Sequence, residues 1–280
     1  MEWQLYLPRL WTDEPDRCRR ADVPQEVVHR TNWRLALGLL DTLAQWQLEA
    51  PVVVADAGYR RQHAVQARSP GARAMSWPCK VRKSAHPEEA EPRQPAYGGL
   101  GPPALPRYRL PPRALSTLAV ETGAEQFSEV TWRQGSKGAM TSWFAVLTVR
   151  PAGKQSLAAA QESVGGRRRW DGILPTRTLL VEWAQGQGAP TDYWMSNLPA
   201  TTPVADLVRW AKTRRRIEHD YRELKHGLGL DHFEGRTWPG RHHHVTLVTA
   251  AQAFLTLRTL GPKAEAPARA STRPSPPKTC

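Results

Sequence analysis

The sequence has few cysteines and no long apolar run, and both absences exclude classes of protein. Cys18, Cys79 and Cys280 are odd in number and far apart, so they form neither a disulfide framework nor a CxxC metal motif. No stretch approaches the ~18 apolar residues of a transmembrane helix, and the first residues lack the pattern of a signal peptide. We therefore expect a cytoplasmic protein with no membrane partner.

Acidic residues are scarce relative to basic ones. The 280 residues contain 39 Lys and Arg but 26 Asp and Glu, which gives a formal charge of +13. Contacts from Lys and Arg to phosphates supply most of the sequence-independent affinity for nucleic acid. The composition therefore makes nucleic acid the first partner to consider, and the 40% of apolar residues suffices for a buried core.

Two proline-rich segments divide the chain, and ordered signals surround them. Of the 25 prolines, ten lie in 70–112 and five in 262–280, so we expect an irregular segment over 60–120 and a disordered basic tail over 261–280. Strands are predicted at 3–8, 52–55, 129–133, 143–149, 178–183 and 193–195, the last four as an antiparallel insertion. Helices are predicted at 33–44, from Pro203 to about 228, and at 244–257.

Two carboxylates stand at positions where a site could form. At 100° per residue, Glu218 and Lys225 lie within about 40° of Arg214 on the helix that starts at Pro203, beside an apolar stripe. The residues of that stripe are Ile217, Leu224 and Leu228. This face is either a solvated surface with ion pairs or the edge of a site. Asp56 follows a buried strand, where it is either a ligand-binding carboxylate or a turn former before Ala57-Gly58.

Several motifs occur in a fixed order. The stretch from Arg214 to Lys225 places Arg214 four residues before Glu218 and Lys225 seven residues after it, and it resembles the signature of DDE-type transposases of bacterial insertion sequences. The Tyr of that signature is replaced by Ala211. The stretch Val53–Tyr59 is similar to the segment with the second catalytic Asp. Further similar segments are 193–199, 229–236 and 242–247, and the resemblance covers about 3–59 and 84–260.

The resemblance implies an α/β, RNase H-like fold that is incomplete because its opening strands are missing, with a strand-rich insertion before the last catalytic helix. The implied division is a partial core with the second catalytic Asp at 1–59, an irregular segment at 60–120, a β-rich insertion at 121–200, the helical part with the Glu at 201–260 and the tail at 261–280.

The resemblance also implies a mechanism and partners. Asp56 and Glu218 would be catalytic and would hold a pair of Mg²⁺ ions for phosphoryl transfer, while Arg214 and Lys225 would contact DNA phosphates. The implied partners are transposon ends and target DNA, bound by a homodimer in the nucleoid. A different class of enzyme, a glycoside hydrolase that uses Asp56 and Glu218 as acid and base, is disfavoured by the charge, by the spacing of Arg214 and Lys225 and by the ordered motifs.

The sequence departs from the family pattern in two places. The first catalytic Asp of the family lies on a strand upstream of the segment similar to Trp3–Pro8, so we expect a truncated, catalytically impaired transposase. The alternative is a non-catalytic DNA-binding remnant or an inhibitor of a full-length transposase. The second departure is at 60–83, where neither the helix nor the strand of the family is evident, and which is either a local double frameshift or a divergent loop.

Aromatic and histidine clusters allow two interpretations each. Consecutive histidines on a helix point about 100° apart, so His242, His243 and His244 favour packing or DNA contact over one shared zinc ion. The tryptophans of the strands either pack in the core or stack on unpaired bases. They are Trp132, Trp143, Trp183 and Trp194.

Overall fold

The computed structural model describes residues 3–48, 52–54, 74–79, 82–99, 101, 104–135 and 138–260. The chain divides into two compact units. The larger comprises 2–13 and 26–220, and the smaller comprises 14–25 and the chain from Tyr221 onward. Asp56, the stretch 60–73 and the tail 261–280 lie outside the described residues.

The larger unit is built on an eight-stranded mixed sheet. Its strands are β1 (Val52–Val54), β2 (Ala74–Cys79), β3 (Ser84–Pro87), β6 (Arg113–Ala114), β7 (Ser128–Gly135), β8 (Gly138–Pro151), β9 (Arg177–Trp183) and β10 (Asp192–Ser196). Their order is β1-β2-β10-β9-β8-β3-β6, with β7 also paired to β8. Only β1 and β2 are parallel among the described pairs; the others are antiparallel.

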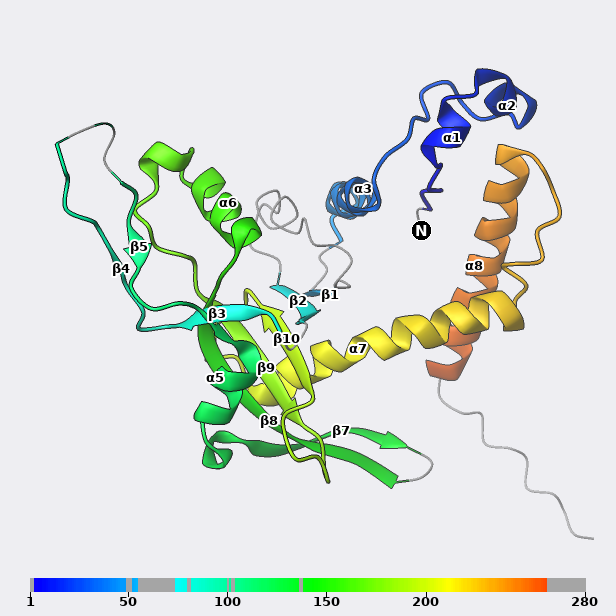
Figure 1. Ribbon diagram of the computed structural model, residues 1–280. Coiled ribbons are helices and arrows are strands. Elements are labelled where there is room, and N and C mark those ends of the chain that lie inside the picture. The colour runs from blue at the N-terminus through cyan, green and yellow to red at the C-terminus, as the bar shows by residue number, and fades with distance from the viewer. Residues whose placement is uncertain are drawn as a thin grey trace, which may run out of the picture. The chain divides into compact units, whose positions relative to one another are not determined.

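The long strand β8 organises the sheet. Along one side it pairs with β9 from Trp143 opposite Trp183 to Val149 opposite Arg177. Along its other side it pairs first with β7 and then with β3. Figure 1 shows β8 beside β9, with β7 along its far half. One strand therefore joins β7 to the rest of the sheet.

Both faces of the sheet are buried, because side chains alternate along each strand. In β9, Leu179 and Val181 lie in one apolar cluster and Leu180 lies in the other. The first cluster is covered by helix α5 (Leu115–Glu121), which contributes Leu115 and Leu118. A continuous apolar run in β9 is what a strand with two covered faces requires.

The second face is covered by the first half of the long helix α7 (Val204–Arg222). Leu207, Val208 and Ala211 are buried there against Phe144 and other sheet side chains. These three positions have the i, i+1, i+4 spacing of one helix face. Ile217, in the second half, is 48% exposed. The apolar stripe expected around Ile217 therefore does not pack on the sheet, and the buried face lies one to three turns earlier.

The remaining elements are short except for three helices. They are α1 (Arg9–Thr12), α2 (Pro15–Arg20), α3 (Asn32–Gln45), α6 (Lys154–Ser163), α8 (Trp238–Leu260), two 3₁₀ turns (Ala124–Gln126 and Arg167–Arg169), a π turn (Glu223–Gly227) and the hairpin of β4 (Pro92–Arg93) with β5 (Arg107–Tyr108). Helix α3 buries Leu37, and Trp33, Leu40 and Val53 of β1 pack against it.

The smaller unit contains α2, the π turn and α8. The backbone N–H of Trp238 donates to the carbonyl of Ala21, which ties the start of α8 to the segment after α2. The side chains of Leu224, Leu230 and Val245 are buried. The Arg241 guanidinium donates to the Leu230 carbonyl, so the chain after the π turn is fixed to α8.

Most of the predicted elements are confirmed, with four differences, the first of which is that α7 ends at Arg222 and not near residue 228. Helix α3, strand β1, the four antiparallel strands, α7 and α8 are present, and α8 begins six residues earlier than expected, at Trp238. Residues 3–8 are not a strand, because no described strand pairs with them. The described part of 60–120 was expected to be irregular but contains five short strands and the start of α5. These strands were not predicted because strands such as β2 and β3 pair with partners distant in sequence and leave no local pattern. No described helix is long and apolar enough to cross a bilayer.

Candidate active site

Helix α7 carries the candidate carboxylate Glu218, and its position follows from how the helix is anchored. The buried face of α7 ends at Ala211, and Glu218 lies two turns later on an exposed stretch. Asp56 and the side chain of Arg214 lie outside the described residues, so their distances to Glu218 remain expectations. The structure thus presents Glu218 to solvent on a helix that is fixed to the sheet at its other half.

A buried ion pair fixes that other half. The Lys212 Nζ donates to the Glu182 carboxylate, whose side chain is 7% exposed. Three rings surround the ammonium: its Nζ lies 4.8 Å from the Trp132 ring centroid, 5.1 Å from that of Trp194 and 5.7 Å from that of Phe144. An ammonium over aromatic faces gains electrostatic energy that grows as water is excluded. Lys212 therefore positions α7, and with it Glu218, on the sheet.

Ala211, which replaces the signature Tyr, lies in a tightly packed part of the core. Ala211 is 3% exposed and packs with Phe144, Leu180 and Trp194. A phenol ring at this position has no room unless the sheet side chains move. The Tyr contact of the family signature is therefore absent at this position.

Lys225 does not lie on a regular continuation of α7. A π turn begins at Glu223, and the N–H of Leu228 donates to the Glu223 carbonyl five residues earlier. Because a π turn holds more residues per turn than an α-helix, the 100° periodicity used to place Lys225 beside Glu218 fails after Arg222. The Lys225 Nζ instead lies 5.4 Å from the centroid of the Tyr221 ring.

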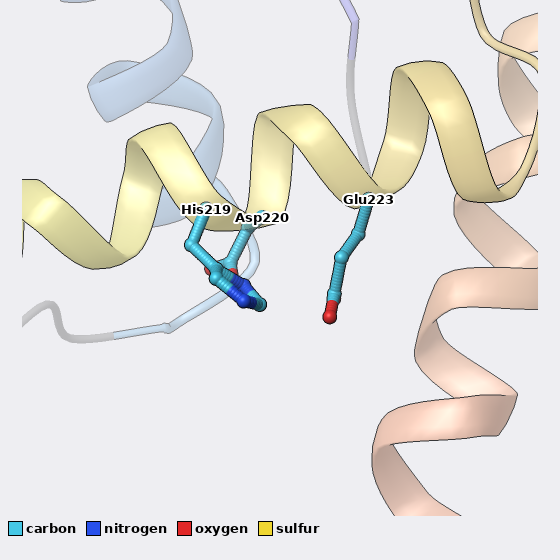
Figure 2. A group of neighbouring side chains, drawn as sticks. All are labelled: His219, Asp220 and Glu223. Carbon is cyan, nitrogen blue, oxygen red and sulfur yellow. The ribbon is translucent and has the colours of Figure 1, made fainter. Parts of the chain in front are cut away.

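Three further polar side chains lie close together along this helical stretch. Figure 2 shows His219, Asp220 and Glu223, whose candidate ligand atoms lie within 4.8 Å of one another and whose side chains are all exposed. Ligands on opposite sides of a Mg²⁺ ion are about 4 Å apart. An exposed histidine and two exposed carboxylates at i, i+1 and i+4 are ordinary on a helix surface, so this group alone defines no metal site.

The histidines of α8 have packing partners. The His242 ring lies 4.6 Å from the Trp238 ring, and the His244 Nε2 lies 2.9 Å from the Gly229 carbonyl oxygen. The two rings thus contact different neighbours, because residues two apart on a helix point about 200° apart.

The tryptophans of the sheet are mostly structural. Trp194 is buried, Trp132 packs against the same cluster, and Trp183 meets Phe127 edge to face. Trp143, in contrast, is 45% exposed. Core packing therefore accounts for three of the four rings.

Comparison with known families identifies the chain. Residues 1–139 match the family model described as DDE superfamily endonuclease. The chain belongs to the DDE superfamily endonucleases. This family implies an RNase H-like fold, and the mixed α/β sheet agrees with that class. The match includes Asp56 and ends before Glu218. No curated protein matches the chain.

Membership of the DDE endonucleases has functional consequences. The family domain indicates a transposase-like nuclease function with DNA as substrate. Enzymes of this superfamily typically use a divalent metal. The carboxylate oxygens of Glu218 and of the neighbouring acidic residues are the donor type that Mg²⁺ prefers.

Sequence reasoning missed the residues that hold α7. Glu182 lies inside the apolar run of β9, between Val181 and Trp183. A carboxylate in a strand with both faces covered needs a buried partner, so Glu182 was itself a signal that a cation packs on this sheet. Its partner, 30 residues away on α7, has no local signature.

Proposed function

We propose that this DDE superfamily endonuclease is a bacterial insertion-sequence transposase, which cuts and joins DNA strands by two-metal phosphoryl transfer. The observation that carries the proposal is the exposed Glu218 on α7, in register with Arg214, in a chain of this family. The charge of +13 supports a polyanionic substrate.

Asp56 and Glu218 are the residues to which we assign metal binding. A bound Mg²⁺ pair supplies Lewis-acid stabilisation of the attacking and leaving oxygens in such reactions. The chain's own contribution that the structure describes is the support of Glu218. Asp56 follows β1 by two residues in the sequence, and Glu218 is held by a helix whose first half is buried on the sheet. Rigid elements position reacting groups more accurately than loops do.

Arg214 and Lys225 are proposed to contact the phosphates beside the cut. An Arg guanidinium binds phosphate as a fork and a Lys ammonium binds as a point charge. Since the π turn changes the direction of Lys225, we assign it to a phosphate farther from Glu218 than the one held by Arg214.

We further propose that residues 1–280 by themselves cut DNA weakly. The DDE set has three carboxylates, and the sequence assigns two of them, Asp56 and Glu218. Two of the three carboxylates would hold the metal ions less firmly than the full set, so we expect catalysis to fall steeply.

The test is binding and nicking of a supercoiled plasmid with Mg²⁺ or Mn²⁺. We expect binding that weakens steeply with salt, by a slope of about 0.9 per phosphate contact in log K against log salt, and little nicking. Asp56→Asn and Glu218→Gln should leave binding intact, as should the control Glu129→Gln on the exposed side of β7.

Three results would contradict separate parts of the proposal. Absence of salt-dependent binding would remove DNA as the substrate. Robust nicking that Glu218→Gln abolishes but Glu129→Gln does not would support the assignment of Glu218 and refute the weak activity of residues 1–280. Robust nicking that survives Glu218→Gln would refute the assignment itself.

A further inference from the structure

An open groove of about 1060 Å³ lies in the larger unit, away from α7. It is bordered by the start of α6, by the segment 104–112 and by the chain around Trp170. None of its described lining residues is Asp or Glu, whereas Arg107, Lys154 and Arg167 all contribute. A groove with three cations and no carboxylate attracts anions.

The start of α6 adds fixed positive potential to the same groove. Gly153 is the N-cap, at φ 112°, and no side chain caps the helix. The first N–H that bonds back within the helix is that of Leu157, which donates to the Gly153 carbonyl. The N–H groups before it point out of the helix start, where backbone donors and the helix dipole favour an anion. A Cβ at Gly153 would meet no atom within 4 Å, so the space over the helix start is open.

The three cations are available for an external anion. Arg107, Lys154 and Arg167 have exposed side chains, and no ion pair joins any of them to another described residue. Surface cations in this chain do pair where carboxylates are near, as Arg113 does with Glu121. The groove therefore keeps its charge for a ligand.

The groove also has an apolar wall, part of which is Tyr108. The Tyr108 ring stacks on His86 at 4.1 Å between centroids, and the Leu174 N–H donates to the Tyr108 hydroxyl at 2.9 Å. Leu110 and Leu157 also line the groove and are 75% and 37% exposed. Large apolar side chains that remain exposed inside a groove indicate a ligand with an apolar face.

We propose that this groove binds an unpaired nucleotide, with its phosphate at the start of α6 beside Lys154 and Arg167 and its base against Leu110 and Leu157. The inference rests on the proposed function, since DNA is the source of such nucleotides in a transposition reaction. A duplex offers only phosphates and sugars on its outside, so it would use the cations and leave the apolar wall bare. An unpaired nucleotide uses both.

The test compares oligonucleotides on the full chain by fluorescence anisotropy. The probes are a labelled single strand of dT, a duplex of equal length, and dTMP as competitor. Lys154→Gln with Arg167→Gln removes two cations, Leu110→Ser removes apolar contact without changing charge, and Arg133→Gln on exposed β7 is the control for charge loss elsewhere. All of these side chains are exposed, so circular dichroism should show an unchanged fold.

The expected result is specific to the single strand. The double variant should reduce the salt slope by about 0.7, because Lys154 and Arg167 share one phosphate contact. Leu110→Ser should weaken single-strand binding about fivefold and leave duplex binding unchanged. Arg133→Gln should affect single-strand binding less than the double variant does.

The experiment distinguishes a free nucleotide from a nucleotide within a strand. It also distinguishes failure of this inference from failure of the proposed function. Displacement of the single strand by dTMP shows that one nucleotide fills the groove, and a lack of displacement shows that a strand is required; both support the binding of an unpaired nucleotide provided that Leu110→Ser weakens the strand. Binding that ignores both groove variants overturns the inference and leaves the proposed function standing. Loss of duplex binding alone in the double variant also overturns it. Absence of any DNA binding overturns the proposed function.

Discussion

Replacing Lys212 with methionine should destabilise the protein by far more than loss of a surface ion pair. The side chains of Lys212 and Glu182 are 16% and 7% exposed. Removing one partner of a buried pair leaves the other charge uncompensated and costs about 3–5 kcal/mol. Contact of the ammonium with the rings of Trp132, Phe144 and Trp194 adds to the loss.

The assay is urea unfolding followed by far-ultraviolet circular dichroism and tryptophan fluorescence. The matched control is Arg209→Met on the same helix, whose ion pair with Asp206 is exposed by 68% and 40% and should contribute at most about 1 kcal/mol. The double variant Lys212→Met with Glu182→Met should regain most of the lost stability, because it leaves no buried charge. The reasoning is refuted if Lys212→Met costs no more than Arg209→Met, or if the double variant is less stable than Lys212→Met.

Three further predictions follow from burial. Ala211→Tyr, which restores the signature residue, should lower stability by about 1–3 kcal/mol because the position is full; an unchanged melting temperature would contradict this packing. Burial lowers the pKa of His86, so its stabilising contribution is complete above its unfolded pKa and is lost as pH falls through its folded pKa. The melting temperature should therefore fall less between pH 7.5 and 5.5 in His86→Phe than in the wild type. Equal losses in the two proteins would exclude His86 as the cause. Burial raises the pKa of the Cys79 thiol to about 11, so at pH 8 only about one in a thousand of these thiols is ionised. A disulfide reagent should therefore modify Cys18 before Cys79, and mass spectrometry of the labelled peptides would confirm or reverse this order.

Local patterns predicted the elements that carry their own signals. Thr31 precedes helix α3 at the N-cap position, and strand β1 is a run of β-branched valines; both elements are present. Strand β2 was not predicted, because its pairing partners, β1 and β10, lie 22 and more than 110 residues away along the chain. Pairings at such separation are set by the whole sheet and not by the strand's own residues.

The residues of the candidate site were predicted from the sequence, but their arrangement in space was not. The spacing from Arg214 to Glu218 lies within regular α7, where helical periodicity holds. The spacing from Glu218 to Lys225 crosses the π turn, which was not predicted from the sequence. Leu224, within this turn, is buried in the smaller unit. Lys212 and the groove at α6 depend on residues brought together by folding, so only the structure reveals them.

Binding of Mn²⁺, a paramagnetic substitute for Mg²⁺, tests the central claim most directly. Titration followed by electron paramagnetic resonance should detect a site in the wild-type chain that is lost in both Asp56→Asn and Glu218→Gln. The same site should persist in Glu223→Gln, which removes one member of the exposed group of His219, Asp220 and Glu223. Binding that survives Asp56→Asn and Glu218→Gln but is lost in Glu223→Gln would contradict the assignment and place the metal on the surface of the helix instead.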